Sequence, residues 1–340
     1  MKQQIVTSTR KIEFREISIP EYKENEVLIK IMRIGICGSD IHVFYGKHPS
    51  TPFPVTQGHE VSGEIIEIGN KVDKFKPGDK VTIQPQVVCG KCFSCLKGNY
   101  HICENLKVMG FQTTGTASEY FVTSEDLLIK LPDKMTFDQG AMVEPVAVAC
   151  SALRKVDNIK DMKIVIIGGG PIGNLTAQAA KAMGAESVLI TEINDFRLKL
   201  AKKVGIDYTV NTRDKNLSEE ITKAFGLDKA DLIIECVGFE NTVEEAISNA
   251  RKGTDIILVG VFGETPKVDL NLVQNHELRL IGTLMYKKED YLKAIDLIQS
   301  ERILVEPLIT NHFSFLDYEK AYDFIEKNKE KVMKVMIDVN

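Results

Sequence analysis

The 340-residue chain lacks any apolar run that approaches the roughly 18 residues a membrane-spanning helix needs. It also lacks an excess of basic charge, because 43 Lys and Arg are set against 48 Asp and Glu, for a net charge of −5. This charge argues against nucleic acid or an anionic membrane as the main partner. The start, MKQQIVTSTR, lacks the hydrophobic segment of a signal peptide. We therefore expect a cytoplasmic protein whose seven cysteines are metal ligands or free thiols.

The chain is long enough for two domains, and its pattern changes near residue 145. Before that point it reads as short strands broken by Gly, Pro and Asn turns. After it, strands and helices alternate, which predicts a doubly wound parallel sheet. The predicted strands of this sheet are 163–168, 187–192, 207–211, 231–238, 254–260 and 278–283. From about residue 285 the chain turns helical again, and 331–339 (KVMKVMIDV) is predicted to return as a strand to the first domain.

Four cysteines with the spacing C-x2-C-x2-C-x7-C form the most specific motif. They are Cys89, Cys92, Cys95 and Cys103. Four thiolates in one short loop can close a tetrahedron around Zn²⁺, which leaves no position for water. The alternatives are two disulfides or four unrelated buried cysteines. Because a closed zinc site performs no chemistry, this lobe directs attention to a second, open metal site.

Candidate ligands for an open site lie in GICGSDIH (35–42) and QGHE (57–60). Cys37, His59 and Glu60 would offer one thiolate, one imidazole and one carboxylate, which suit Zn²⁺ with a position left for water or substrate. Taken singly, Cys37 is more simply a buried thiol and His59 a loop histidine. Their occurrence together, beside a four-cysteine lobe, favours the metal site.

A dinucleotide-binding motif, GGGPIG (168–173), stands between a predicted strand and a predicted helix. Its glycines permit a tight turn, the approach of a pyrophosphate and close helix packing. Glu192 ends the next strand, where a carboxylate accepts hydrogen bonds from ribose hydroxyls and repels the 2′-phosphate of NADP, so NAD is favoured. Arg197 could fold back toward a phosphate and so favour NADP, but an arginine at this position is more simply a solvated charge on the following helix. The predicted cofactor-binding residues are Gly168, Gly170, Pro171, Ile172, Gly173, Glu192 and Arg197. The alternative is a Rossmann fold without a cofactor.

The segment 58–72, G-H-E-x2-G-x5-G-x2-V, resembles the signature of zinc-containing medium-chain alcohol dehydrogenases. The CGSDxH segment (37–42), the four-cysteine lobe, Glu144-Pro145 and the glycine loop follow in that family's order. The chain is most similar to the polyol branch, the sorbitol (L-iditol) dehydrogenases, through MVEPVAV (142–148). At this point simple alcohol dehydrogenases carry a cysteine ligand, whereas this chain carries Glu144.

The resemblance implies an α/β protein with a GroES-like, mainly β catalytic domain at 1–147 and 285–340 and a Rossmann domain at 148–284. It implies two zinc ions per chain: a structural one in the lobe and a catalytic one held by Cys37, His59 and Glu60. Glu144 would bind the catalytic ion directly or through water. Glu60 and Glu144 are hard oxygen ligands that also suit Mn²⁺. The family further implies a homodimer or homotetramer, with pairing through the apolar strand 278–283.

The implied reaction is transfer of a hydride from a secondary hydroxyl of a polyol to NAD⁺, which gives a ketose. The implied catalytic residues are Ser39, His42 and Glu144. Ser39 would take the hydroxyl proton, and His42 is either the next group that carries this proton or a structural histidine. Val43 and Met285 depart from animal-type sorbitol dehydrogenases, which carry Tyr and Arg there, so the sugar alcohol stays open.

Two lysine-containing pairs, Lys47-His48 and Lys287-Lys288, read either as solvated surface charge or as a phosphate clamp. The second reading would make the substrate a polyol phosphate of the arabitol phosphate or galactitol phosphate type. The motifs are equally compatible with an L-threonine or glucose dehydrogenase, and with a non-catalytic sensor that binds NAD and zinc.

Overall fold

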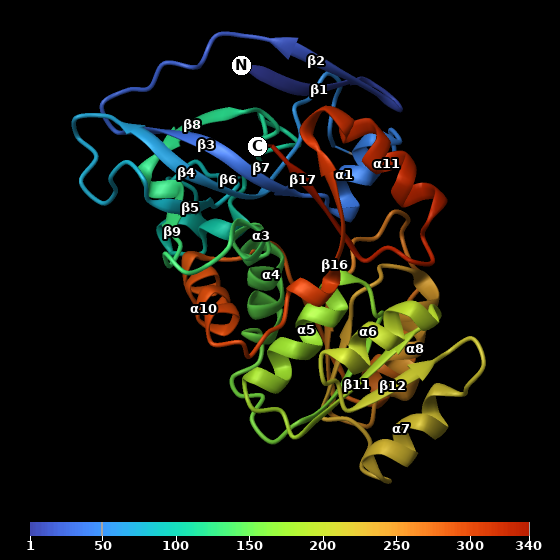
Figure 1. The fold of residues 1–340 in the computed structure, drawn as a ribbon. Helices are drawn as coiled ribbons and strands as arrows, with labels where there is room; N and C mark the ends of the chain where they lie inside the picture. The colour runs from blue at the N-terminus through green and yellow to red at the C-terminus, as the bar shows by residue number, and fades with distance from the viewer. Residues whose placement is uncertain (49, 340) are drawn as a thin grey trace. The chain divides into compact units, whose positions relative to one another are not determined.

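The computed structural model describes residues 1–48 and 50–339, and the chain divides into two compact units (Figure 1). The first unit contains 1–144, 287–299 and 309–339, and the second contains 145–286 and 300–308. Helix α4 (Val143–Leu153) begins in the first unit and continues in the second. In the described part of the chain, every helix is too short or too polar to cross a bilayer.

The first unit is built on a mixed sheet with the order β16-β17-β3-β4-β5-β9, and β8 also pairs with β3. Its strands are β1 (Lys2–Ser8), β2 (Lys11–Glu16), β3 (Glu26–Gly35), β4 (Glu60–Ile68), β5 (Lys80–Ile83), β6 (Gln86–Val87), β7 (Lys107–Val108), β8 (Tyr120–Ser124), β9 (Leu128–Lys130), β16 (Ile309–Ser314) and β17 (Lys334–Asp338). Its helices are α1 (Gly38–Phe44), α2 (Phe93–Leu96), α3 (Phe137–Ala141), α10 (Lys288–Gln299) and α11 (Tyr318–Lys327). The predominance of strands confirms the predicted mainly β character.

Strand β3 is the centre of this sheet because nearly every second residue is apolar and buried. Ile29, Ile31 and Ile34 are fully buried in the core of the unit. Strand β17 pairs antiparallel with the end of β3, with Met336 opposite Gly35. The predicted return strand is therefore confirmed, and it brings the last residues of the chain beside the loop that follows β3.

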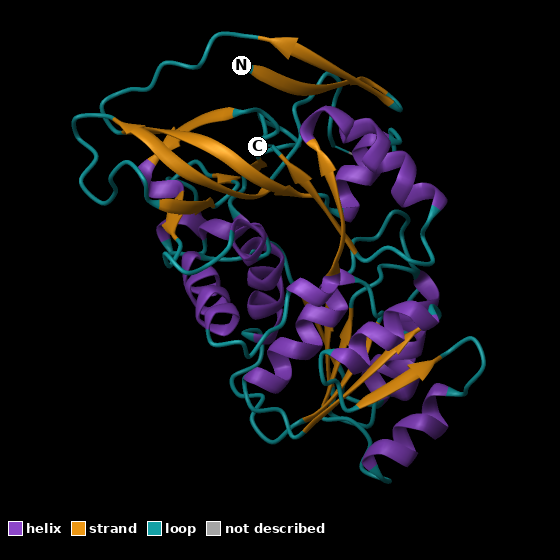
Figure 2. Ribbon diagram, in the orientation of Figure 1, coloured by secondary structure: helices purple, strands orange, loops and turns teal. Residues whose placement is uncertain are grey.

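The second unit contains a parallel sheet with the order β12-β11-β10-β13-β14-β15, which confirms the predicted doubly wound fold. Its strands are β10 (Lys163–Ile167), β11 (Ser187–Glu192), β12 (Tyr208–Asn211), β13 (Leu232–Glu235), β14 (Asp255–Leu258) and β15 (Arg279–Gly282). The helices α5 (Pro171–Ala182), α6 (Asp195–Lys203), α7 (Leu217–Phe225), α8 (Glu240–Asn249) and α9 (Leu270–Asn275) alternate with them (Figure 2). The strand order reverses between β10 and β13, and in such sheets ligands bind at this point, at the carboxyl ends of the strands.

The segment 300–308 groups with the second unit, whereas the sequence analysis placed all of 285–340 in the catalytic domain. The cause is a pair of hydrogen bonds to Gln178 of α5. The Leu304 N–H donates to Gln178 Oε1 at 2.8 Å, and Gln178 Nε2 donates to the Leu304 carbonyl at 3.2 Å. Gln178, which is 3% exposed, thus ties this short segment to α5.

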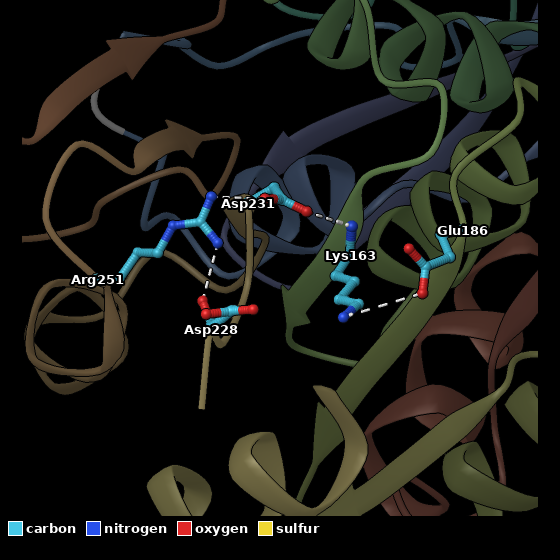
Figure 3. Close-up of a pocket in the computed structure, with 5 residues that line it drawn as sticks. All are labelled: Lys163, Glu186, Asp228, Asp231 and Arg251. Atoms are coloured by element: carbon cyan, nitrogen blue, oxygen red, sulfur yellow. Dashed lines mark hydrogen bonds and ion pairs between the residues drawn. The ribbon is translucent and has the colours of Figure 1, made fainter. Parts of the chain in front are cut away.

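A charged pocket of about 430 Å³ lies at the amino ends of the strands in the second unit (Figure 3). Arg251 donates to Asp231 at 2.6 Å and to the Asp228 carbonyl at 2.8 Å. The Lys163 backbone N–H donates to Asp231 at 2.8 Å, and the Lys163 ammonium lies 4.0 Å from Glu186. These charges neutralise one another at the edge opposite the one where ligands bind in such sheets.

Candidate functional site

The four-cysteine lobe gathers its sulfur atoms within 4.8 Å of one another. The Cys103 sulfur lies 3.5 Å from that of Cys89 and 3.9 Å from that of Cys92. A tetrahedron with Zn–S bonds of about 2.3 Å has edges of roughly 3.8 Å, so these separations fit a zinc ion. They are far longer than the ~2.05 Å of a disulfide, and all seven cysteines are free.

Backbone N–H groups point at the sulfur atoms of this lobe, as expected around thiolates. The Cys92 N–H donates to Cys89 Sγ at 3.3 Å, and the Asn105 N–H donates to Cys103 Sγ at 3.3 Å. Hydrogen bonds from the backbone of Lys91 and Cys92 lower the pKa of the Cys89 thiol to about 6. The donor set therefore suits a closed structural zinc site.

The second group of candidate ligands comes from two neighbouring strands of the first unit. The side chains of Cys37, His59 and Glu60 place their ligand atoms within 4.8 Å of one another. Gly35 ends β3 directly opposite Glu60, which begins β4, so the sheet register brings the two loops together. The Cys37 side chain is partly exposed, whereas His59 and Glu60 are buried. The arrangement has one accessible side, which an open metal site requires.

Asp40 braces two of these candidate ligands. Its Oδ2 accepts a hydrogen bond from the Cys37 backbone N–H at 2.9 Å, and its Oδ1 lies 3.5 Å from His59 Nδ1. A carboxylate beside Nδ1 leaves Nε2 as the ring atom for a metal. Burial lowers the pKa of His59, but Asp40 and the Cys37 sulfur raise it well above its usual value. One thiol, one imidazole and one carboxylate within 4.8 Å of one another are a donor set that fits the predicted zinc ion.

A buried lysine that the sequence analysis did not identify completes the cluster. Lys334 Nζ donates to both carboxylate oxygens of Glu60, at 2.6 and 2.8 Å, and to the Ile36 carbonyl at 3.2 Å. Burial lowers the pKa of Lys334, but Glu60 and Cys37 outweigh it and raise the pKa. Glu60 is therefore a carboxylate already partly neutralised by a fixed cation. The sequence feature that could have identified Lys334 is its position as a single lysine within the apolar strand VMKVMIDV.

The three predicted catalytic residues lie in the first unit. Ser39 and His42 are three residues apart on α1, hence on one face of that helix, with Ser39 partly exposed and His42 exposed. Glu144 is the second residue of α4, is 6% exposed and acts on the charge of Lys334. The group within 4.8 Å is Cys37, His59 and Glu60, without Glu144, so direct binding by Glu144 stays a prediction.

The other predicted substrate positions differ in their surroundings. Val43 is 1% exposed and belongs to the hydrophobic core of the first unit. The Lys288 backbone N–H donates to the Tyr100 hydroxyl at 2.6 Å, which fixes Lys288 against the four-cysteine lobe. Lys47 is exposed and His48 is half-buried.

The glycine loop of the second unit has the geometry that a pyrophosphate site needs. Gly168 has a φ of +100°, which glycine adopts readily, and Gly170 caps α5, with Pro171 at the first helical position and Ile172 after it. A Cβ on Gly173 would lie 1.8 Å from the Gly168 carbonyl oxygen. The free N–H groups of the α5 N-terminus favour an anion.

Glu192 and Arg197 lie against this loop. A Cβ on Gly169 would come within 2.8 Å of Glu192 Cβ, and one on Gly170 would lie 3.8 Å from Arg197 Nη1. Glu192 Oε1 accepts from the Ile193 backbone N–H at 2.8 Å, and Oε2 lies 3.3 Å from Arg197 Nη1. Arg197 is therefore folded back toward the loop and is not the solvated helix charge that the sequence favoured.

Replacement of Gly173 by alanine is expected to raise the Kd for NADH more than tenfold, because the new methyl group would displace the Gly168 carbonyl. Fluorescence titration with NADH measures this. Gly282→Ala is the control, since a Cβ there meets no atom within 4 Å. Unchanged NADH affinity in a folded Gly173→Ala protein would contradict the assignment of this loop to the cofactor.

Comparisons with known proteins agree with this geometry. Residues 23–133 match the alcohol dehydrogenase GroES-like domain, and residues 171–300 match the zinc-binding dehydrogenase family. The chain is 35% identical to a sorbitol dehydrogenase of Halalkalibacterium halodurans, over 94% of each chain. It is 34% identical to a D-arabitol-phosphate dehydrogenase of Enterococcus avium, over 96% of this chain and 94% of that one. Its structure resembles galactitol-1-phosphate dehydrogenase from Escherichia coli with a TM-score of 0.93 and 31% identity, over 99% of this chain and all of the other.

The fold and the two groups of candidate metal ligands are those of an oxidoreductase built from a GroES-like unit and a Rossmann-like unit. The chain belongs to the zinc-containing medium-chain alcohol dehydrogenase family, and its relatives place it in the polyol branch. Its cofactors are accordingly zinc and a nicotinamide dinucleotide.

Proposed function

We propose that this protein oxidises a secondary hydroxyl of a polyol to a ketone with NAD⁺, which gives a ketose. The observation that carries the proposal is the meeting of Cys37, His59 and Glu60 at a partly exposed position beside Ser39. The similarity to sorbitol and polyol-phosphate dehydrogenases supports a polyhydroxylated substrate.

In this proposal each predicted site residue of the first unit has a distinct role. Cys37, His59 and Glu60 would hold the catalytic ion, and Glu144 would bind it directly or through water. When bound, zinc acts as a Lewis acid toward the substrate oxygen, and the nicotinamide accepts the hydride. Ser39 accepts the hydroxyl proton as it donates its own proton to His42, which is exposed on the same helix face and releases a proton to solvent. The four-cysteine lobe holds the structural ion.

The test is NADH formation, followed by absorbance, against tetritols, pentitols, hexitols, their phosphates and L-threonine. Turnover of free polyols supports the proposal. Turnover of the phosphates alone would make the protein a polyol-phosphate dehydrogenase, the second candidate, which the exposed Lys47 beside His48 favours. Turnover of L-threonine alone, or of nothing on the panel by zinc-loaded protein that binds NADH, would contradict the proposal.

The cofactor preference is expected to depend on Glu192. Glu192→Ser removes the charge that repels a 2′-phosphate and frees Arg197 from its 3.3 Å ion pair. We expect the ratio of kcat/KM for NADP⁺ to that for NAD⁺ to rise at least about tenfold. Glu186→Ser, at an exposed carboxylate of the same unit, is the matched control. An unchanged ratio in Glu192→Ser would remove this residue from the cofactor site.

We further propose a cytoplasmic homodimer or homotetramer. The strand β15 is at the edge of its sheet, and Leu280 and Ile281 are only partly buried, so its unpaired backbone can pair with a second copy. Light scattering in solution tests the oligomeric state, and a monomer at micromolar concentration would contradict the proposed homodimer or homotetramer.

A further inference from the structure

An aromatic ring joins the candidate metal site to a second histidine of the first unit. The Phe111 ring centroid lies 5.0 Å from that of His59 and also 5.0 Å from that of His48. Phe111 is 7% exposed, so it is a fixed wall. His48 therefore lies no more than 10 Å, ring to ring, from a candidate ligand of the metal, although 11 residues separate the two in sequence.

Two buried charged groups cover part of the ligand cluster. Asp40 is fully buried behind Cys37 and His59, and Lys334 is 3% exposed behind Glu60. The more exposed residues are those of α1 and the loop after it: Ser39 and His48 are half-buried and His42 is exposed. A chain-like substrate with one hydroxyl at the metal can contact these accessible side chains, whereas Asp40 and Lys334 are covered.

The His48 ring has one hydrogen-bonding atom committed and one remaining. Its Nδ1 lies 2.8 Å from the Thr51 hydroxyl, which fixes the ring and leaves Nε2 to face another partner. Burial and the nearby His42 lower the pKa of His48, although Asp40 opposes them. A neutral imidazole at pH 7 suits a hydrogen bond with an uncharged hydroxyl better than an ion pair with a phosphate.

We propose that His48 is a specificity-determining residue of this site, whose Nε2 binds a distal hydroxyl of the polyol while Phe111 packs along the carbon chain. The inference rests on the proposed function and deepens it. A hydroxyl several carbons from the reacting carbon is within reach of His48, whereas a short secondary alcohol ends before it. The enzyme then discriminates in favour of polyhydroxylated substrates because a short alcohol leaves His48 without this hydrogen bond.

The experiment compares kcat/KM for a hexitol and for 2-propanol in the wild type, His48→Leu and His48→Gln. Leucine keeps the packing against Phe111 but removes the polar atom, so we expect the hexitol-to-propanol ratio to fall about tenfold. Glutamine places an amide near the position of Nε2, and we expect it to keep the ratio within about threefold of the wild type. His312→Leu, at an exposed histidine bound to Asp338, is the control and should keep the wild-type ratio.

The outcomes distinguish a failure of this inference from a failure of the proposed function. If the wild type oxidises 2-propanol but no polyol, the proposed function fails and this inference with it. If the wild type prefers the hexitol and His48→Leu, with its zinc content intact, retains that preference, only the role of His48 is overturned. A loss confined to hexitol phosphates would assign the ring to phosphate and would also overturn hydroxyl recognition. Should His48→Leu fail to fold, an altered ratio in Thr51→Val, which releases Nδ1, supports the proposal and an unaltered one opposes it.

Discussion

Replacement of Cys37 by serine is expected to lower kcat/KM for the polyol at least about 10³-fold and to reduce bound zinc from two ions per chain to one. A serine hydroxyl stays protonated near pH 7 and is a poor substitute for a thiolate ligand. The Lewis-acid contribution of a bound metal amounts to several kcal/mol, and about 1.4 kcal/mol corresponds to a factor of ten in rate. Steady-state kinetics and metal analysis of the same preparation measure both effects.

The matched control for this prediction is Cys150→Ala, at a buried cysteine of α4 outside both groups of candidate ligands. It should keep two zinc ions and most of the activity. If Cys37→Ser retained both ions and turned over the polyol at the wild-type rate, Cys37 would not be a ligand of the catalytic metal.

The second large effect is expected from Lys334→Met, which should lower the free energy of unfolding by about 3–5 kcal/mol. The side chains of Lys334 and Glu60 are 3% and 1% exposed, so the substitution leaves a carboxylate buried without its counter-charge. Urea unfolding of the metal-depleted protein measures the change without a contribution from zinc binding. Adding Glu60→Gln should restore part of the stability, because the unpaired charge is then gone.

A surface ion pair provides the comparison. Lys130 lies 2.7 Å from Asp79 but is 50% exposed, so Lys130→Met should cost less than about 1 kcal/mol. Equal losses for Lys334→Met and Lys130→Met would show that burial of the Glu60 pair does not govern its stability. A double variant no more stable than Lys334→Met alone would point to lost packing of the lysine stem instead.

The features that could be predicted from sequence are those encoded by short-range spacing. The four cysteines of the lobe lie within 15 residues of one another, and the loop 168–173 lies directly between a strand and a helix. The parallel sheet follows from a repeated alternation of strands and helices, each recognisable in its own segment. In such cases the local pattern carries the geometry, because the chain between the relevant residues is short.

The partners of the candidate site could not be predicted because they depend on tertiary packing. Lys334 meets Glu60 across 274 residues, and the pairing of β17 with β3 and of β3 with β4 brings them together. Phe111 links His48 to His59 through ring contacts that leave no spacing motif. Arg197 makes an ion pair with Glu192, whereas the sequence favoured a solvated charge on the following helix.

The measurement that tests the proposed chemistry most directly is NADH formation from a hexitol by the metal-depleted protein before and after zinc is returned. We expect no measurable turnover without metal, and recovery of activity that follows occupancy of the second zinc ion per chain. Full activity in metal-free protein would contradict zinc-dependent catalysis. Protein that carries two zinc ions and binds NADH, yet oxidises no polyol, would contradict the proposed reaction itself.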